Sequence, residues 1–197
     1  MDNTCKKCRR EGVKLFLKGA KCDSPKCPLT RRNYPPGDAG ARRRQTKTSD
    51  FALQLREKQK AKKIYHISEK QFRKYFLNAA KKEGSTSLNL LQILEARLDN
   101  AIFRAGLTVS RAAARQIANH GKAKLNNKKV NIPSILVKKG DKIQVDLPKN
   151  IAIPNAKPAN WIKLDKKNNT FEIINQPQTL SEELGLNTQL IIEYYSR

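Results

Sequence analysis

Apolar residues recur at helical spacing in the middle of the chain. Residues 50–63 carry Phe51 and Leu55 on a segment otherwise rich in basic side chains, which predicts an amphipathic helix. Ser68 is followed three residues later by Gln71, a spacing typical of a capping box. A second helix is therefore expected to begin there.

A third helix is expected from about Ser87 to Arg104, with Gly106 as its terminator. Its apolar stripe repeats every three or four residues, at Leu90, Leu91, Leu94, Leu98 and Ile102. The three predicted helices are most simply the core of a small helical domain.

A short helix is predicted between Ser110 and Gly121. Arg111 and Arg115 are four residues apart and share a face, whereas Ile117 points roughly the opposite way. One face is therefore expected to pack and the other to meet an anion.

Short strands are predicted after this helix. Residues 123–132 indicate two strands around an Asn-Asn-Lys turn, and 135–147 another pair around Gly140 and Asp141. Near the C-terminus, further strands are indicated by alternating or clustered apolar residues at Phe171, Ile173, Ile174, Leu190, Ile191, Ile192 and Tyr194. Acidic residues outnumber basic ones from 164 onward, so this part is expected to pack on the core and to face a protein neighbour. Core packing alone explains the apolar residues equally well.

Charge changes the picture more than any single element. The 197 residues include 41 Lys and Arg but only 17 Asp and Glu, for a formal charge of +24. Such an excess indicates a polyanionic partner, usually nucleic acid and less often an acidic membrane surface. No apolar run approaches the roughly 20 residues of a membrane span. The polar N-terminus does not resemble a secretory signal, so a protein of a reducing compartment is expected.

All four cysteines lie near the N-terminus, as Cys5-x2-Cys8 and Cys22-x4-Cys27 separated by thirteen residues. Two close pairs in a reducing compartment favour one structural zinc ion in a closed shell of four thiolates. Free or disulfide-bonded cysteines and a redox dithiol are weaker interpretations, and ligand type alone does not separate zinc from an iron–sulfur cluster.

A basic segment follows at residues 30–50. Its prolines and glycines disfavour regular structure, and its arginines and Tyr34 suit a phosphate backbone or an unpaired base. The alternative is a solvated linker.

Several long strings carry a resemblance to a known family. RLDNAIFRAGLTVSRAAARQIANHGKAKLNNKKVNIPS resembles the RNA-binding module named after small-subunit ribosomal protein four. CKKCRREG, RRNYPPG, LQLREKQKAKKIY, EKQFRKYF and the terminal LIIEYYSR resemble the ribosomal protein four family itself, in the same order. The likeness covers essentially the whole chain and indicates the bacterial branch, in the subset that keeps its zinc ligands.

The resemblance implies a structural, non-enzymatic constituent of the cytoplasmic small ribosomal subunit. Family members bind small-subunit rRNA early in assembly and influence decoding accuracy. They touch small-subunit protein five and lie near the path by which messenger RNA (mRNA) enters the subunit. Neither a membrane nor a small-molecule substrate is implied.

The expected fold class is α+β, in four segments. They are a zinc-binding basic segment (1–45), a helical rRNA-binding domain (46–93), an inserted α+β RNA-binding module with a small antiparallel sheet (94–156), and C-terminal strands with a short helix (157–197).

Site residues are carried over from the family by position. The zinc ligands are Cys5, Cys8, Cys22 and Cys27. The RNA contacts are Arg9, Arg10, Arg31, Arg32, Tyr34, Arg42, Arg43, Arg44, Lys47, Arg56, Lys58, Lys60, Lys62, Lys63, Arg73, Lys74, Arg97, Asn100, Arg104, Arg111, Arg115, His120, Lys122, Asn126 and Lys128.

One departure from the family is a shortened segment, LPKNIAIPNAKPAN, before Trp161. Its three prolines disfavour the helix expected in relatives, which puts any rRNA contact of that segment in doubt.

Other classes of protein share parts of this pattern. The same module occurs in non-ribosomal RNA-binding proteins and in pseudouridine synthases, whose catalytic aspartate lies in an Arg-Leu-Asp motif. Arg97-Leu98-Asp99 matches that motif, but it lies inside the module and too few residues follow for a separate catalytic domain. Asp99 is therefore expected to pair with an arginine or to cap a turn. A zinc-finger DNA reader is disfavoured because the paired histidines of that class are missing.

Overall fold

The computed structural model describes residues 3–37, 48–147, 157–177 and 185–196. The chain divides into two compact units, one of Met1–Phe72 with Ser181–Arg197 and one of Arg73–Leu180. The division into four segments stays a prediction. In the described part of the chain, no helix combines the length and the apolar character needed to cross a membrane.

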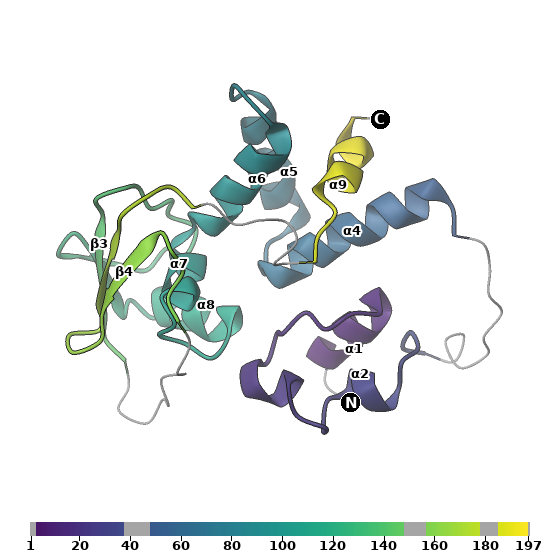
Figure 1. Ribbon diagram of the computed structural model, residues 1–197, viewed down its shortest axis with the longest axis horizontal. Coiled ribbons are helices and arrows are strands. Elements are labelled where there is room, and N and C mark those ends of the chain that lie inside the picture. The colour runs from purple at the N-terminus through teal and green to yellow at the C-terminus, as the bar shows by residue number, and fades with distance from the viewer. Residues whose placement is uncertain (1–2, 38–47, 148–156, 178–184, 197) are drawn as a thin grey trace. The chain divides into compact units, whose positions relative to one another are not determined.

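The first unit is helical. It contains α1 (Asn3–Glu11), the 3-10 turn η1 (Gly19–Cys22), α2 (Pro28–Arg31), α4 (Asp50–Ile64), the start of α5 (Glu69–Ala80) and α9 (Thr188–Tyr195) (Figure 1). The predicted helix over 50–63 is confirmed as α4. The predicted start of the second helix is also confirmed, because Ser68 Oγ accepts a hydrogen bond from the backbone N–H of Gln71 at 3.3 Å.

Helix α9 corrects the prediction of strands at Leu190–Tyr194. Asn187 caps it, since its Oδ1 accepts hydrogen bonds from the backbone N–H groups of Gln189 and Leu190 at 3.1 and 3.3 Å. Ile191 is buried, and α9 packs along α4 (Figure 1). A short apolar run fits either element, and here the cap and the packing on α4 select the helix.

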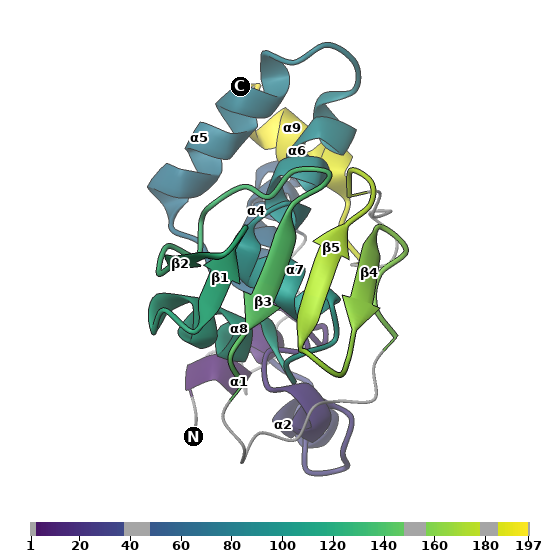
Figure 2. The same ribbon diagram turned by 90° about the vertical axis from the view of Figure 1, so that its left-hand side faces the viewer.

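The second unit joins helices to one antiparallel sheet. Its helices are the end of α5, α6 (Thr86–Glu95), α7 (Leu98–Arg104) and α8 (Arg111–Asn119). Its strands are β1 (Ala123–Leu125), β2 (Lys128–Val130), β3 (Lys142–Val145), β4 (Ile162–Asp165) and β5 (Thr170–Ile173), in the order β2-β1-β3-β5-β4 (Figure 2). The α+β class is thus confirmed.

One hydrophobic core lies between this sheet and helices α7 and α8. Leu98 and Ile102 of α7 and Ile117 of α8 pack in one cluster with Ile143 and Phe171 from the sheet. The apolar faces of the two helices and the apolar face of the sheet therefore pack together in a single layer.

The first strand pair is confirmed, with Asn126 and Asn127 at the turn. Their φ angles are +48° and +67°, the left-handed pair of a two-residue hairpin that asparagine tolerates. The second predicted strand pair, over residues 135–147, is wrong. Within this range only the second strand forms, as β3, whereas Leu136 makes an isolated bridge to Arg97.

The prediction of one continuous third helix from Ser87 to Arg104 is also wrong, because two helices, α6 and α7, form there. The chain leaves helical geometry at Arg97 (φ −69°, ψ 140°), between α6 and α7. The backbone N–H groups of Leu98 and Asp99 donate to the carbonyls of Ile135 and Pro133 at 2.8 and 3.1 Å. The apolar stripe continues across the break because both helices pack on apolar neighbours. Periodicity alone therefore does not indicate the break.

A polar cluster fastens α9 to α4 in the first unit. Lys58 is buried, with its Nζ 2.9 Å from Glu69 Oε1 and 4.3 Å from the ring centroid of Tyr194. Tyr195 donates its hydroxyl to the same oxygen at 2.8 Å. Partial burial works against ionisation of Glu69, but hydrogen bonds from Lys58, Lys62 and Tyr195 outweigh it and lower the pKa of Glu69 to about 2.

A carboxylate whose pKa is lowered on folding stabilises the fold at neutral pH and loses that contribution as pH falls toward the folded-state pKa. Glu69→Gln should lower the free energy of unfolding by about 0.5–1 kcal/mol at pH 7, a figure reduced for solvent screening. The difference from the native chain should shrink toward pH 2. Urea denaturation across this pH range measures it, with Glu83→Gln, exposed in the second unit, as the control. A difference that is equal at all pH values would contradict the assignment.

Candidate functional site

The four cysteines line one small cavity in the first unit. Cys5 and Cys8 lie one turn apart on α1, Cys22 ends η1 and Cys27 directly precedes α2. They share a cavity of about 20 Å³ and none forms a disulfide. The backbone N–H of Lys18 donates to Cys22 Sγ at 3.4 Å.

The surroundings disfavour the thiolate forms of Cys5 and Cys8. Burial, followed by the charges of Cys22 and Cys27, raises the pKa of Cys5. Burial and the other three cysteines also raise the pKa of Cys8, although a backbone hydrogen bond at Leu15 lowers it. A bound cation would replace these protons and remove the repulsion.

No group of three or more His, Cys, Asp or Glu side chains among the described residues is already arranged to hold a metal. The sulfurs converge on one space without standing in ligand positions. The number and chemistry of the four thiols fit a closed zinc shell. The assignment of all four cysteines as zinc ligands stays a prediction.

The basic face predicted on α4 is largely occupied by ion pairs. Lys62 Nζ lies 2.9 Å from Glu69 Oε2, and Lys60 pairs with Glu57 at 3.2 Å. Arg56 lies 3.3 Å from Glu11, whose buried carboxylate also pairs with Lys63. These side chains hold the first unit together, and their remaining exposure is partial.

Arg9 has a similar structural role in the basic segment. Its side chain is buried, its Nε donates to the carbonyls of Arg32 and Tyr34 at 3.2 and 2.9 Å, and its guanidinium carbon lies 4.6 Å from the Tyr34 ring centroid. Arg10, Arg31 and Arg32 stay exposed. Predicted contacts at Arg42, Arg43, Arg44 and Lys47 lie outside the described residues.

The second unit contains an arginine–carboxylate cluster. It consists of two buried carboxylates and the four arginines around them, namely Glu95, Asp99, Arg97, Arg104, Arg111 and Arg115. Four guanidinium groups against two carboxylates leave two positive charges in excess. The helix break at Arg97 lies inside this cluster.

Asp99 is the first centre of the cluster. Arg97 grips it with two parallel bonds, from Nε to Oδ1 at 3.0 Å and from Nη2 to Oδ2 at 2.6 Å, and Arg115 Nη1 donates to Oδ2 at 3.1 Å. Tyr75 accepts a hydrogen bond from Arg97 Nη1 at 2.7 Å. Burial opposes the charge of Arg97, but the bonds and charge of Asp99 raise its pKa. The predicted arginine pairing of Asp99 is confirmed.

Glu95 is the second centre. Arg104 donates to both of its oxygens, at 2.7 and 3.2 Å, and Asn100 Nδ2 donates to Oε2 at 2.9 Å. Arg111 donates from Nε to Asn100 Oδ1 at 2.7 Å and lies over the ring of Phe103, 4.5 Å from its centroid. Arg111 and Arg115, the two arginines on the predicted anion-facing side of α8, thus both reach buried acceptors within the unit.

The predicted RNA contacts thus fall into distinct groups. Arg97, Asn100, Lys58 and Arg9 are buried and engaged within the chain. Arg104, Arg111 and Arg115 are anchored but partly exposed, at 18, 13 and 37 % of their side chains. Exposed positions comprise Arg73, Lys74, His120, Lys122, Asn126 and Lys128.

Sequence reasoning missed Glu95 and Tyr75 as members of the site. Glu95 follows Leu91 by four residues and precedes Leu98 by three, so helical spacing places its carboxylate on the apolar stripe. A lone acid on such a stripe in a strongly basic chain is the signal that points to a buried ion pair.

Comparisons with known proteins give two family models that meet at residues 95 and 96. The model of the ribosomal protein S4/S9 N-terminal domain matches residues 1–95, and that of the S4 domain matches residues 96–143. The chain is 48% identical over 200 residues to small ribosomal subunit protein uS4 of Dictyoglomus turgidum, covering 98% of this chain and 96% of that one. It is 46% identical over 207 residues to uS4 of Syntrophomonas wolfei, covering 100% and 98%, and 45% identical over 202 residues to uS4 of Thermus thermophilus, covering 98% and 96%.

Removing one carboxylate from the arginine–carboxylate cluster should be costly. Asp99→Asn would leave Arg97 buried without a counter-charge, and we expect the free energy of unfolding to fall by about 3–5 kcal/mol. Asp146→Asn removes an exposed carboxylate of the same unit and should stay within about 0.5 kcal/mol of the native chain. Urea denaturation compares them, and equal stability of the two variants would rule out a structural role for the Asp99 charge.

Proposed function

Because the chain belongs to the family of small ribosomal subunit protein uS4, we propose that it is a structural constituent of the small ribosomal subunit and binds small-subunit rRNA directly. Its place is then the cytoplasmic small subunit, among rRNA and other ribosomal proteins. The observation that carries the rRNA contact is the arginine–carboxylate cluster, which holds partly exposed arginines in fixed positions with an excess of positive charge.

A fixed array of guanidinium groups suits a folded RNA. Buried carboxylates orient Arg104 and Arg115, so less side-chain freedom is lost when they meet phosphates. The exposed Lys122 and Lys128 extend the positive surface onto the β1–β2 hairpin. Phosphate contacts of this kind set the position of a protein on RNA, while the shape of the RNA supplies selectivity.

The Arg97-Leu98-Asp99 motif supports a structural role over an RNA-modifying one. A catalytic aspartate must reach its substrate, but Asp99 is buried and accepts hydrogen bonds from Arg97, Arg115 and the backbone of Asn100.

The resemblance to the family extends the proposal to finer roles. We place small-subunit protein five and the incoming mRNA among the neighbours of the protein, and we assign it roles in early assembly and in decoding accuracy. The less basic C-terminal part, from 164 onward, suits a protein neighbour better than RNA.

We further propose one structural Zn²⁺ bound by Cys5, Cys8, Cys22 and Cys27. Convergence of the four thiols on one cavity supports it, as does the N–H···S bond from Lys18 to Cys22. The zinc would join α1 to the start of α2 and would so stabilise the segment from which Arg10, Arg31 and Arg32 project.

The rRNA contact is tested by the salt dependence of binding. Replacing both Lys122 and Lys128 with glutamine removes two exposed charges from the hairpin. The slope of log affinity against log salt for an rRNA junction should flatten by nearly one unit per residue. Junction binding should also weaken more than binding to an unstructured RNA of equal length.

A matched control removes equal charge elsewhere in the same unit. Lys163 and Lys166 are exposed on β4 and the turn after it. The Lys163→Gln, Lys166→Gln pair should leave the junction preference intact. If both pairs reduce binding to both RNAs alike, the hairpin contributes only nonspecific charge.

The zinc proposal is tested by elemental analysis of the full-length protein. We expect about one zinc per chain, and loss of that zinc in Cys8→Ser. A structural zinc contributes on the order of 10 kcal/mol to the folding of its own segment, so chelation should remove the ordered amide signals of residues 3–37 and leave those of the second unit. A metal-free protein, or iron with a visible chromophore, would refute zinc.

A further inference from the structure

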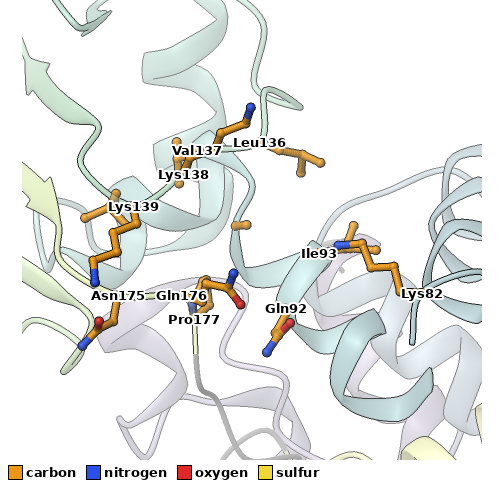
Figure 3. A pocket seen from close by; sticks show the side chains of 12 residues that line it. Lys82, Gln92, Ile93, Leu136, Val137, Lys138, Lys139, Asn175, Gln176 and Pro177 are labelled. Carbon is orange, nitrogen blue, oxygen red and sulfur yellow. The ribbon is translucent and has the colours of Figure 1, made fainter. Parts of the chain in front are cut away.

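The second unit contains a half-open groove whose lining residues lie outside the proposed rRNA contact. Its volume is about 460 Å³, and it lies between the end of α6, the segment 136–139 before β3 and the segment 173–177 after β5 (Figure 3). This size falls within the range of ordinary ligand pockets, about 300–1,000 Å³, and accommodates a few side chains of a partner.

The floor and one wall of the groove are apolar. Ile93, Val137 and Ile173 are buried beneath it, and Leu136 at its edge leaves 44 % of its surface exposed. An exposed leucine above a buried apolar floor marks a surface suited to aliphatic side chains of another protein.

The rim of the groove is positive. Lys82, Lys138 and Lys139 line it and are exposed, and no carboxylate is among the described lining residues. Figure 3 shows Lys82 and Lys139 on opposite sides, with the amides of Gln92 and Gln176 between them. None of the three lysines forms an ion pair with a carboxylate in the described part of the chain.

The lining favours peptide over RNA. Unpaired bases are held by stacking on aromatic rings or on guanidinium planes, and the described lining contains neither. Lysines on flexible stems act as point charges that suit carboxylates, and side-chain amides suit the backbone groups of an extended chain.

We infer that this groove is a docking site for an acidic protein segment that carries aliphatic side chains. Its leucine- or isoleucine-like residues lie against Leu136 and the floor, and its carboxylates face the lysines of the rim. The interaction is separate from rRNA binding, because none of the groove residues belongs to the arginine–carboxylate cluster or to the hairpin.

A synthetic peptide tests this directly. Fluorescence anisotropy measures binding of the full-length protein to a fluorescein-labelled peptide in which glutamate and leucine alternate. A peptide with serine in place of leucine has the same charge, and a single-stranded oligouridylate of equal charge represents RNA. We expect the leucine peptide to bind at least tenfold more tightly than either control, and to shift the amide signals of Ile93, Leu136 and Ile173.

Matched variants locate the site. Leu136→Asp should weaken peptide binding at least tenfold, whereas Leu88→Asp, at an apolar residue of α6 that is 55 % exposed and outside the groove, should change it less than twofold. Lys139→Glu should also weaken binding, and Lys163→Glu on β4, an exposed residue outside the groove with the same change of charge, should not. All four variants should keep their affinity for the rRNA junction within about threefold.

Three results would overturn the inference. One is equal binding of the leucine and serine peptides, which would mean that charge alone determines binding and that the apolar floor contributes nothing. Another is tighter binding of the oligouridylate, with shifts at the same amides. A third is a shift of these amides with protein concentration in the absence of peptide, which would assign the groove to a second copy of the chain.

Discussion

The pairing of Asp99 and Glu95 with four arginines is the constraint on which the second unit depends. Both carboxylates are almost fully buried, and two unpaired charges in that position would destabilise the fold strongly. The arginines come from α7, α8 and the break between α6 and α7, so the cluster fixes how these elements meet. Satisfying the carboxylates leaves excess positive charge at the surface, and in this way one interaction stabilises the fold and orders the face that we propose for rRNA binding.

The same logic operates on a smaller scale in the first unit. A chain of +24 must bring basic helices together despite repulsion. Glu11 and Glu69 each take two cations from α4, and α9 is fastened where Lys58 meets Glu69 and the tyrosine rings. Glu11 and Glu69 thus neutralise basic side chains where helices meet, while exposed lysines and arginines are left for RNA to neutralise.

Local signals in the sequence predicted local structure well. Ser68, Ser110 and the Asn126–Asn127 turn act within four residues, and the helix starts and the hairpin form where those signals indicated. The break at Arg97 was not predictable in the same way, since its backbone partners lie at 133–137. Likewise, composition identified the arginines as cationic candidates, but the acceptors of Arg111 and Arg115 lie 11 and 16 residues away along the chain.

The candidate site shows the same division. Spacing was enough to group the cysteines, and the fold gathers them on one cavity. Periodicity placed Arg111 and Arg115 on a common face, but only the structure shows that Asn100 and Asp99 hold them. The groove beside Leu136 has no periodic signature, because three segments far apart in sequence form it.

Arginine side-chain NMR of the full-length protein, free and bound to an rRNA junction, tests the central claim most directly. The Nε–H groups of Arg97, Arg104 and Arg111 each donate to a partner within the unit. They should therefore give separate, slowly exchanging signals in the free protein. On binding, the signals of Arg104 and Arg111 should shift and that of Arg97 should remain in place. Averaged, rapidly exchanging signals in the free protein, or no shift with rRNA, would contradict a pre-ordered arginine face.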